Sequence, residues 1–352
     1  MSILVVGGAG FIGSHFILEW LAENHELVVN LDKLTYAGDL TAFSSLSLQK
    51  KKSSYLFVQG DMGDRELVFS LLKAHRIRAV INFAAESHVD RSIRQPEDFI
   101  QTNVVGTFCL LEAVRQFWEG LQAQAQSNFR FLQISTDEVY GSLAPDAPAF
   151  QEINRYQPNN PYAASKAAAD HLVRSYYQTY KFPAMTLHGS NNYGPRQYPE
   201  KLIPLIIHNA LRNKPLTIHG DGLQKRDWLF VLDYCHAVRL VLEAGRIGET
   251  YNIGGLNERT NLAVVKMICE FLDNLQPRHD GKLYQTGIIF TPDRPGNDRR
   301  YAMDTSKIEH ELGWRPQESF DQGLWKTVQW YLDNQDWMQQ VTAYAYPEKV
   351  VE

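Results

Sequence analysis

Residues 7–13 read Gly-Gly-Ala-Gly-Phe-Ile-Gly, and this stretch decides the fold because of what surrounds it. An apolar run, Ile3–Val6, precedes it, and residues 14–24 repeat apolar side chains at helical spacing after it. Glycines let the backbone turn sharply and approach a pyrophosphate, whose charge is attracted to the N-terminus of a helix. A glycine motif alone is weak evidence of function, but between a strand and a helix it predicts a dinucleotide-binding strand, turn and helix.

A carboxylate after the second predicted strand indicates which dinucleotide binds. Asp32 follows the strand Leu27–Leu31, about 20 residues after the last glycine. A carboxylate there bonds the ribose hydroxyls and repels a 2′-phosphate, so the sequence favours NAD over NADP, a preference that the adjacent Lys33 weakens. Later strand ends are expected to add cofactor contacts from Asp61, Met62, Ala84, Ala85 and Thr102.

The first half of the 352-residue chain alternates β-branched runs with longer helical patterns, as a parallel sheet covered by helices requires. The other predicted strands are 55–58, 79–83, 129–134 and 184–187, and the long predicted helices are 96–119 and 162–180. After about Tyr193, prolines and glycines cluster and the strands become short. The sequence therefore predicts an α/β protein with a Rossmann-type doubly wound parallel sheet and a smaller mixed α/β C-terminal substrate domain.

These patterns also give expected domain bounds. Residues 1–192 should form the NAD-binding domain, with segments from about 231–285 added to it. Residues 193–230 and 286–340 should form the smaller domain, and 341–352 a tail without clear periodicity.

Composition excludes several classes of protein. The formal net charge is −5, so no basic field recruits nucleic acid or an anionic membrane. Cys109, Cys235 and Cys269 lie far apart without a CxxC pair, which is typical of reduced thiols rather than disulfides or a metal site. No apolar run approaches the roughly 18 residues of a membrane span, and apolar strand residues begin at Ile3, where a signal peptide would lie. We therefore expect a soluble cytoplasmic protein that binds no metal.

A candidate catalytic set follows the fifth predicted strand. Tyr162 and Lys166 are four residues apart and so share one helix face. The nearby ammonium and a positively charged nicotinamide both favour the phenolate, so the pKa of Tyr162 is expected to fall from about 10 toward neutrality. The preceding strand ends in Ser-Thr-Asp-Glu, residues 135–138, at the edge where parallel sheets bind ligands. Thr136 is expected to steer a substrate hydroxyl toward Tyr162.

At these residues the sequence resembles the extended short-chain dehydrogenase/reductase family of NAD-dependent epimerases and dehydratases, and within it the dTDP-glucose 4,6-dehydratases. The resembling stretches span nearly the whole chain: GGAGFIG (7–13), DKLTYAG (32–38), AAESHVDRSI (84–93), STDEVYGS (135–142), YAASKAAADHLVR (162–174), SNNYGP (190–195), PEKLIP (199–204) and DRPGNDRRYAMD (293–304). The pair Asp137 and Glu138 is the most diagnostic, because most sugar-nucleotide epimerases of the family lack it.

The resemblance implies a reaction that begins with oxidation of the sugar at C4 by NAD, which makes the C5 proton acidic. Glu138 would remove that proton, and Asp137, held protonated, would protonate the departing C6 hydroxyl. Return of the hydride to C6 would give dTDP-4-keto-6-deoxyglucose and water, for deoxysugar synthesis of the rhamnose type. The resemblance also implies a homodimer built from helices 96–119 and 162–180.

The resemblance carries over these site residues. Catalysis is expected of Thr136, Asp137, Glu138, Tyr162 and Lys166. The cofactor set is Gly7, Gly10, Phe11, Ile12, Gly13, Asp32, Lys33, Leu34, Thr35, Asp61, Met62, Phe83, Ala84, Ala85, Ser87, Thr102, Tyr162, Lys166 and Asn192. The substrate set is Ser87, His88, Thr136, Asn191, Glu200, Lys201, Leu202, Thr217, Ile218, His219, Arg226, Asn261, Asp293, Arg294 and Asn297. The two arginines suit a diphosphate, because their planar forks meet phosphate oxygens bidentately.

Four positions depart from the family pattern. Asn297 replaces the usual His of the RPGHD loop, and His219 replaces a Tyr. Leu232 and Tyr234 replace a Glu and a His. Two alternatives remain, a related dehydratase acting on UDP-glucose and a catalytically inactive NAD-binding regulatory protein. The complete catalytic set argues against the regulator, which has no need of an acid for C6.

Overall fold

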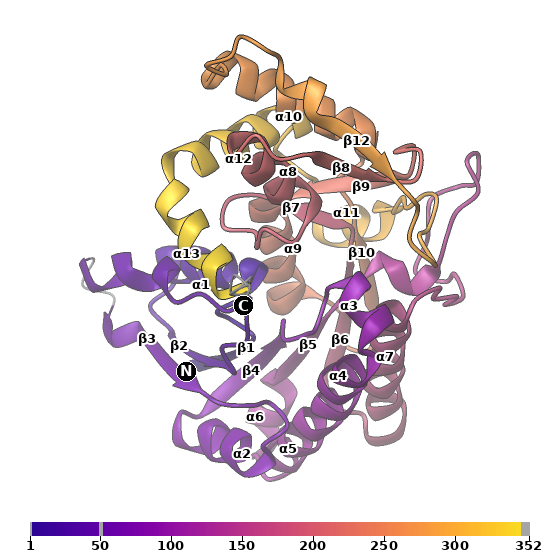
Figure 1. Cartoon of the computed structure of the whole chain (residues 1–352). Coiled ribbons are helices and arrows are strands. Elements are labelled where there is room, and N and C mark those ends of the chain that lie inside the picture. The colour runs from indigo at the N-terminus through magenta and orange to yellow at the C-terminus, as the bar shows by residue number, and fades with distance from the viewer. Residues whose placement is uncertain (1, 49–51, 346–352) are drawn as a thin grey trace.

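Seven parallel strands form the main sheet of the computed structural model, which describes residues 2–48 and 52–345 (Figure 1). Their order is β10-β6-β5-β4-β1-β2-β3. The bounds are β1 (Ser2–Val6), β2 (Leu27–Asp32), β3 (Tyr55–Gln59), β4 (Ile77–Asn82), β5 (Arg130–Thr136), β6 (Ala184–Gly189) and β10 (Thr250–Ile253). The chain winds outward from β1 in both directions, so the predicted doubly wound fold is confirmed.

Helices cover both faces of this sheet, which explains why its central strands read as continuous apolar runs. Ile3 and Val5 of β1 pack with residues of α1 (Phe11–Glu23) and α9 (Val231–Ala244). Leu4 and Val6 face the opposite core. Residues of three helices complete that core: α2 (Arg65–Ala74), α5 (Thr107–Glu119) and α7 (Pro161–Tyr180).

The predicted helix 96–119 is interrupted. It consists of α4 (Pro96–Phe99), a π-helical segment, η3 (Ile100–Gly106), and α5. Within the π-helical segment, Asn103 is buried, and its amide accepts from the Glu86 backbone N–H (2.9 Å) and donates to the Glu86 carbonyl (3.0 Å). It also donates to Ser165 of α7 at 2.8 Å. The wider turn therefore fixes the loop after β4 against the helix that carries Tyr162.

A smaller mixed unit lies beyond one end of the sheet (Figure 1). It contains a three-stranded sheet, β11-β9-β7, and a two-stranded sheet, β12-β8. Their bounds are β7 (Asn191–Tyr193), β8 (Leu216–His219), β9 (Lys225–Phe230), β11 (Glu258–Thr260) and β12 (Ile288–Thr291). One core joins β7, β8, β9 and β12 to α8 (Leu202–Leu211), α10 (Asn261–Leu275) and α12 (Phe320–Asp333).

The packing differs from the expected domain bounds in two segments. Of residues 231–285, α9 and β10 join the large sheet, but α10 packs in the smaller core through Val264, Ile268 and Leu272. Conversely, α11 (Ser306–Leu312) lies in the segment given to the smaller unit, yet Ile308 packs in the core of the large sheet. Each helix packs its apolar face in one of the two cores, and the order of segments along the chain does not indicate which core that is.

The expected tail is also partly helical. Residues 341–352 were expected to form a tail without clear periodicity, but α13 (Gln335–Ala345) extends into this segment as far as residue 345. Residues 346–352 lie outside the described part of the chain. In Figure 1 this yellow helix lies beside the indigo N-terminal region. No helix within residues 2–48 and 52–345 is long and apolar enough to cross a membrane.

Candidate active site

The glycine loop packs tightly against neighbouring strands. Gly7 has φ +78°, and its backbone N–H donates to the Leu31 carbonyl at 2.9 Å. A Cβ on Gly7 would lie 2.5 Å from the backbone nitrogen of Ala84, and one on Gly13 would lie 2.5 Å from the Gly7 oxygen. Larger residues would therefore push the loop outward, whereas these glycines keep it close to the N-terminus of α1, where a pyrophosphate is attracted.

Asp32 is held between the glycine loop and the loop after β2. Its carboxylate accepts from the backbone N–H groups of Ala9 and Leu34, each at 2.8 Å. Burial raises the pKa of Asp32, and these two bonds oppose the shift. Lys33 points elsewhere, since its ammonium pairs with Asp61 at 2.7 Å. The Asp32 carboxylate therefore fits a ribose diol, and Lys33 is engaged by a partner.

The predicted cofactor residues gather around the ends of the first four strands. Gly7, Gly10, Phe11, Ile12 and Gly13 follow β1, and Lys33, Leu34 and Thr35 follow Asp32 at the end of β2. Asp61 and Met62 follow β3, Phe83, Ala84, Ala85 and Ser87 follow β4, Thr102 lies in η3, and Asn192 lies in β7. Met62 is buried against Gly106 of the π-helical segment, which places the ends of β3 and η3 together.

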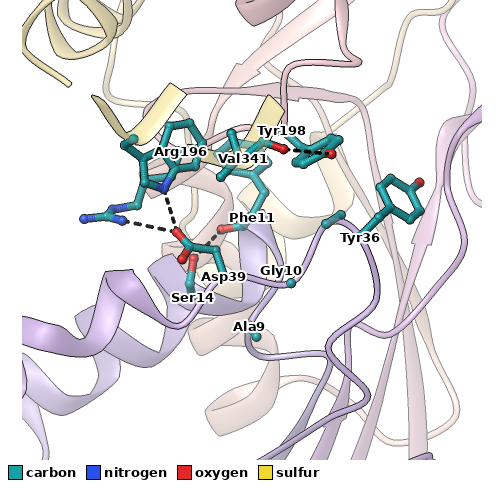
Figure 2. A pocket seen from close by; sticks show the side chains of 12 residues that line it. Ala9, Gly10, Phe11, Ser14, Tyr36, Asp39, Arg196, Tyr198 and Val341 are labelled. Atoms are coloured by element: carbon teal, nitrogen blue, oxygen red, sulfur yellow. Dashed lines mark hydrogen bonds and ion pairs between the residues drawn. The ribbon is translucent and has the colours of Figure 1, made fainter. Parts of the chain in front are cut away.

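The C-terminal helix reaches this region from the far end of the chain. Trp337 of α13 donates from Nε1 to Oδ2 of Asp39 at 2.7 Å, and the Asp39 N–H donates to the Ala9 carbonyl at 2.9 Å. Arg196 lies 3.6 Å from the same Asp39 oxygen. A cavity of about 20 Å³ lies between the glycine loop and α13. Figure 2 shows the side chains that line it. Helix α13 therefore supports the glycine loop from outside.

A larger cleft of about 770 Å³ lies between the two units. All the predicted substrate residues line it except Thr136 and Asp293. Sequence reasoning missed several other lining residues, including Tyr36, Arg91, Arg94 and Trp228. Arg91 and Arg94 belong to α3 (Val89–Arg94), and Arg91 lies over the Tyr36 ring at 4.2 Å. The sequence Asp-Arg-Ser-Ile-Arg, residues 90–94, could have indicated that these two arginines lie near the substrate, because it directly follows Ser87 and His88.

Cationic and acidic side chains both line the cleft. Arg226 donates to the side chain of Asn297 at 3.0 Å and lies 4.5 Å from the centre of the Tyr301 ring. Glu200 accepts from the Tyr36 hydroxyl at 3.3 Å. Burial, and then the Lys201 charge, lower the pKa of His88 to about 4, so that ring is neutral near pH 7. The arginines therefore supply the positive charge that a diphosphate requires.

Two carboxylates with different surroundings directly follow β5. Asp137 is 1% exposed, and its Oδ2 has no hydrogen-bond partner in the described part of the chain. Burial, then the charges of Glu138 and Asp227, raise the pKa of Asp137 well above its usual range. Burial also raises the pKa of Glu138, but a bond from Asn160 opposes that shift. The pair is thus arranged for one acid and one base.

Tyr162 and Lys166 both lie on α7, where their spacing predicted a shared helix face, and both are buried. Lys166 donates to the Ile134 carbonyl at 2.7 Å, and burial lowers its pKa. The expected fall in the pKa of Tyr162 rested on Lys166 and a bound nicotinamide together, and the surrounding protein groups act in the opposite direction. Burial and the Glu138 charge raise it, and a hydrogen bond from Thr136 opposes the rise. The sequence showed the Lys166 charge but not the depth at which the phenol is buried.

The four departures from the family pattern fall in two groups. Asn297 and His219 line the cleft, and Asn297 bridges Arg226 to Asp293, to which it donates at 2.7 Å. Tyr234 is buried in the core of the large sheet, where the absence of a side chain at Gly189 leaves room for its ring. Leu232 is 37% exposed. Neither Leu232 nor Tyr234 is among the cleft's lining residues.

Comparison with known proteins agrees with this geometry. A family described as GDP-mannose 4,6 dehydratase matches residues 4–327. A dTDP-glucose 4,6-dehydratase of Xanthomonas campestris (strain B100) is 55% identical over 97% of this chain and 96% of its own. One of Neisseria gonorrhoeae is 52% identical over 95% of this chain and 96% of its own. The chain belongs to the dTDP-glucose 4,6-dehydratase family.

Solved structures of the dTDP-glucose 4,6-dehydratase family share the fold. The Streptomyces venezuelae dehydratase, crystallised with NAD, is 41% identical, covers 97% of this chain and 100% of its own, and superposes with a TM-score of 0.86. A UDP-glucose 4-epimerase of Thermotoga maritima superposes with a TM-score of 0.82 at 27% identity, over 95% of this chain and 100% of its own. The fold is therefore shared with epimerases, and the reaction must be argued from the site.

Proposed function

We propose that the protein converts dTDP-glucose to dTDP-4-keto-6-deoxyglucose and water, using bound NAD. The observation that carries this proposal is the pair Asp137 and Glu138, which follows β5 directly: Asp137 is buried, whereas Glu138 is half-buried and lines the cleft. An epimerase that only oxidises and reduces C4 needs no such pair. The pair lies beside Tyr162 and Lys166, whose chemistry both reactions share.

The cleft residues would place the substrate. Arg226 and Arg294 are suited to the diphosphate, and Asn297 holds Arg226 in place through a 3.0 Å bond. Glu200 and Lys201 would contact the base and sugar. Lys201 is itself anchored, because its ammonium donates to the Ser87 carbonyl at 2.7 Å.

Tyr162 would take the proton of the C4 hydroxyl, with Thr136 orienting that hydroxyl. When bound, NAD supplies the hydride acceptor for C4 and the hydride donor for C6, and its positive ring favours the phenolate. The glycine loop, the Asp32 carboxylate and the N-terminus of α1 fit this cofactor. Lys166 stabilises the phenolate through its charge.

Glu138 would next take the C5 proton, which the C4 ketone has made acidic. Asp137 gives its proton to the C6 hydroxyl, which leaves as water. A hydride at C6 and a proton at C5 then complete the product, so the sugar loses one water and its overall oxidation state is unchanged. The raised pKa of Asp137 favours its protonated form, which a general acid requires.

The same proposal covers compartment and assembly. We propose a cytoplasmic enzyme of rhamnose-type deoxysugar synthesis, supported by three free cysteines in the described residues. We also propose a homodimer, supported by exposed apolar residues such as Phe108 on α5 and Tyr180 on α7. Light scattering at micromolar concentration should give twice the chain mass, and a monomer mass would contradict it.

One assay tests the reaction and its alternatives together. Purified protein is incubated separately with dTDP-glucose and UDP-glucose, and the 4-keto-6-deoxy product is followed. Faster formation from dTDP-glucose supports the proposal, and faster formation from UDP-glucose favours the other dehydratase. No product from either, despite bound NAD, would leave the regulatory protein as the better reading.

A further inference from the structure

One loop of the large unit, residues 32–39, reaches from the cofactor region into the cleft. Both of its ends are bonded to Ala9 of the glycine loop: the Asp32 carboxylate accepts from the Ala9 N–H at 2.8 Å, and the Asp39 N–H donates to the Ala9 carbonyl at 2.9 Å. Tyr36, near the middle of this loop, lines both the small cavity beside the glycine loop and the large cleft. The position of Tyr36 in the cleft therefore depends on the glycine loop.

The phenol of Tyr36 is held by contacts on its ring and on its hydroxyl. The Arg91 guanidinium lies over the ring, 4.2 Å from its centre. The ring of Tyr198, from the segment between β7 and α8, meets it edge-on with the ring centres 5.4 Å apart (Figure 2). The hydroxyl donates to Oε1 of Glu200 at 3.3 Å. A residue of the cofactor region therefore holds a predicted substrate residue directly.

Glu200 depends on that hydroxyl. Its side chain is 7% exposed, and within the described part of the chain Tyr36 is the one hydrogen-bond donor to its carboxylate. The ring of His88, whose pKa is about 4, lies 3.7 Å from Oε2. The Lys201 ammonium lies 3.8 Å from Oε1 and donates to the Ser87 carbonyl at 2.7 Å instead. Because a buried carboxylate without hydrogen bonds is costly, loss of the hydroxyl should displace Glu200.

We propose that Tyr36 is a positioning residue that couples the two ligand sites, because its hydroxyl holds Glu200 from a loop that the bound dinucleotide orders. This coupling rests on the proposed function, which places NAD on the glycine loop and the nucleotide sugar against Glu200. By thermodynamic linkage, each ligand then strengthens the binding of the other by the same factor. The cofactor is held most tightly while the sugar occupies the cleft, the stage at which loss of NADH would leave an oxidised sugar that cannot be completed.

The test compares two rates of NAD exchange on the intact holoenzyme. Bound NAD is exchanged for isotope-labelled NAD, with and without saturating dTDP, which carries the base and the diphosphate but no sugar to react. Wild type should exchange NAD about tenfold more slowly when dTDP is bound. The ratio of the two rates measures the coupling, whereas a merely structural change would alter both rates alike.

Two substitutions remove the two partners of the bond. Tyr36→Phe keeps the ring, with its contacts to Arg91 and Tyr198, and removes only the hydroxyl, so the ratio should fall to about twofold or less. Glu200→Ala removes the acceptor and should lower the ratio equally, and adding Tyr36→Phe to it should cause no further loss. Tyr284→Phe is the matched control, since its hydroxyl donates within the smaller unit and it lines neither cavity. It should keep the wild-type ratio.

Equal, non-additive loss of the ratio in Tyr36→Phe and Glu200→Ala supports the proposal. An unchanged ratio in Tyr36→Phe would overturn it, and so would exchange that is faster to the same extent with and without dTDP, which would mean that Tyr36 holds the cofactor alone. If Tyr36→Phe loses NAD altogether, Glu200→Ala tests the coupling from the cleft, and a wild-type ratio there overturns it.

The wild-type protein separates this inference from the proposed function. Product formation from dTDP-glucose without any effect of dTDP on NAD exchange would end only the coupling. A wild type that neither binds dTDP nor forms product would end the proposed function itself.

Discussion

Asn160 donates from Nδ2 to Oε2 of Glu138 at 3.3 Å, while its own Oδ1 accepts from the Ala163 backbone N–H at 2.8 Å. One side chain therefore caps α7, which carries Tyr162, and orients the proposed base. The two tasks use different atoms and can be separated by substitution.

Asn160→Ser should lower turnover about tenfold with little loss of stability. Serine caps helices as well as asparagine does, but its hydroxyl is too short to reach Glu138 as well. Asn160→Ala is the matched control, and it should lose the same activity and in addition about 1 kcal/mol of stability. Thermal unfolding and kcat separate the effects. Full activity in the serine variant would mean that Asn160 does not orient Glu138.

Glu138→Gln should reduce turnover by roughly 10²- to 10⁴-fold, because the amide cannot accept the C5 proton. Oxidation at C4 does not need this base, so the variant should hold more NADH than wild type, and exchange of the C5 hydrogen with solvent should slow in parallel. Absorbance and NMR measure the two effects. Tyr162→Phe is the control and should show no NADH. Dehydration at the wild-type rate in Glu138→Gln would remove Glu138 as the base.

Asp137→Asn should slow water loss while C5 exchange continues, because an amide is a poor acid for the C6 hydroxyl. Burial and the Glu138 charge raise the pKa of Asp137, so the wild-type enzyme should lose dehydration as pH rises through that value. The same shift has a consequence for stability. Since the folded pKa exceeds the unfolded one, of about 4, folding becomes less favourable as pH rises between them.

Asp137→Asn has no proton to lose and should therefore unfold at a higher temperature than wild type at pH 8, with a smaller difference at pH 5. Calorimetry at the two pH values checks this. An unchanged difference would mean that Asp137 ionises normally in the folded protein.

Asn297→Ala should raise KM for the nucleotide sugar about three- to tenfold with kcat nearly unchanged. The substitution removes the acceptor that holds Arg226 at 3.0 Å, and binding then has to order that arginine. Asn297→His, which gives the usual family residue, should keep a low KM. A fall in kcat alone would place Asn297 closer to the reacting carbons than the structure does.

Trp337→Phe should make NAD leave faster, while wild type should retain the cofactor because the hydride returns to the same substrate. The variant keeps an aromatic ring and loses the indole N–H that holds Asp39 at 2.7 Å. Nicotinamide content after repeated desalting measures the difference. Trp325→Phe, on α12, is the control and should retain NAD as wild type does. Stoichiometric NADH release by wild type would contradict retention.

Local signals were enough to predict the sheet and the motifs of the cleft. The glycine loop, Asp32 and the Tyr162–Lys166 spacing are short patterns whose meaning depends on a few flanking residues. Asp137 and Glu138 are adjacent in sequence, so their proximity needed no fold. These local patterns do not show how deeply a side chain is buried. Burial is the largest cause of the raised pKa of Tyr162.

Contacts between distant segments could not be predicted in this way. Asp170 and His188 meet because the chain returns from α7 to β6, and the motif that contains Asp170 does not indicate that His188 is its neighbour. The π-helical segment that buries Asn103 shifts the register of the helix, so that Phe108 is exposed while Phe99 and Leu111 are buried, and no local pattern marks this shift. Helix α10 packs in the core of the smaller unit and not against the large sheet, and its amphipathic sequence is compatible with either. These are properties of packing, which a single sequence records only indirectly.

The bond between Asp39 and Trp337 also orders events in time. The two residues are 298 positions apart, so a ribosome releases the strands and loops of the cofactor site long before the helix that supports them. A truncation before Trp337 would therefore leave every residue of the glycine loop in place and still remove one of the bonds that hold its neighbour Asp39.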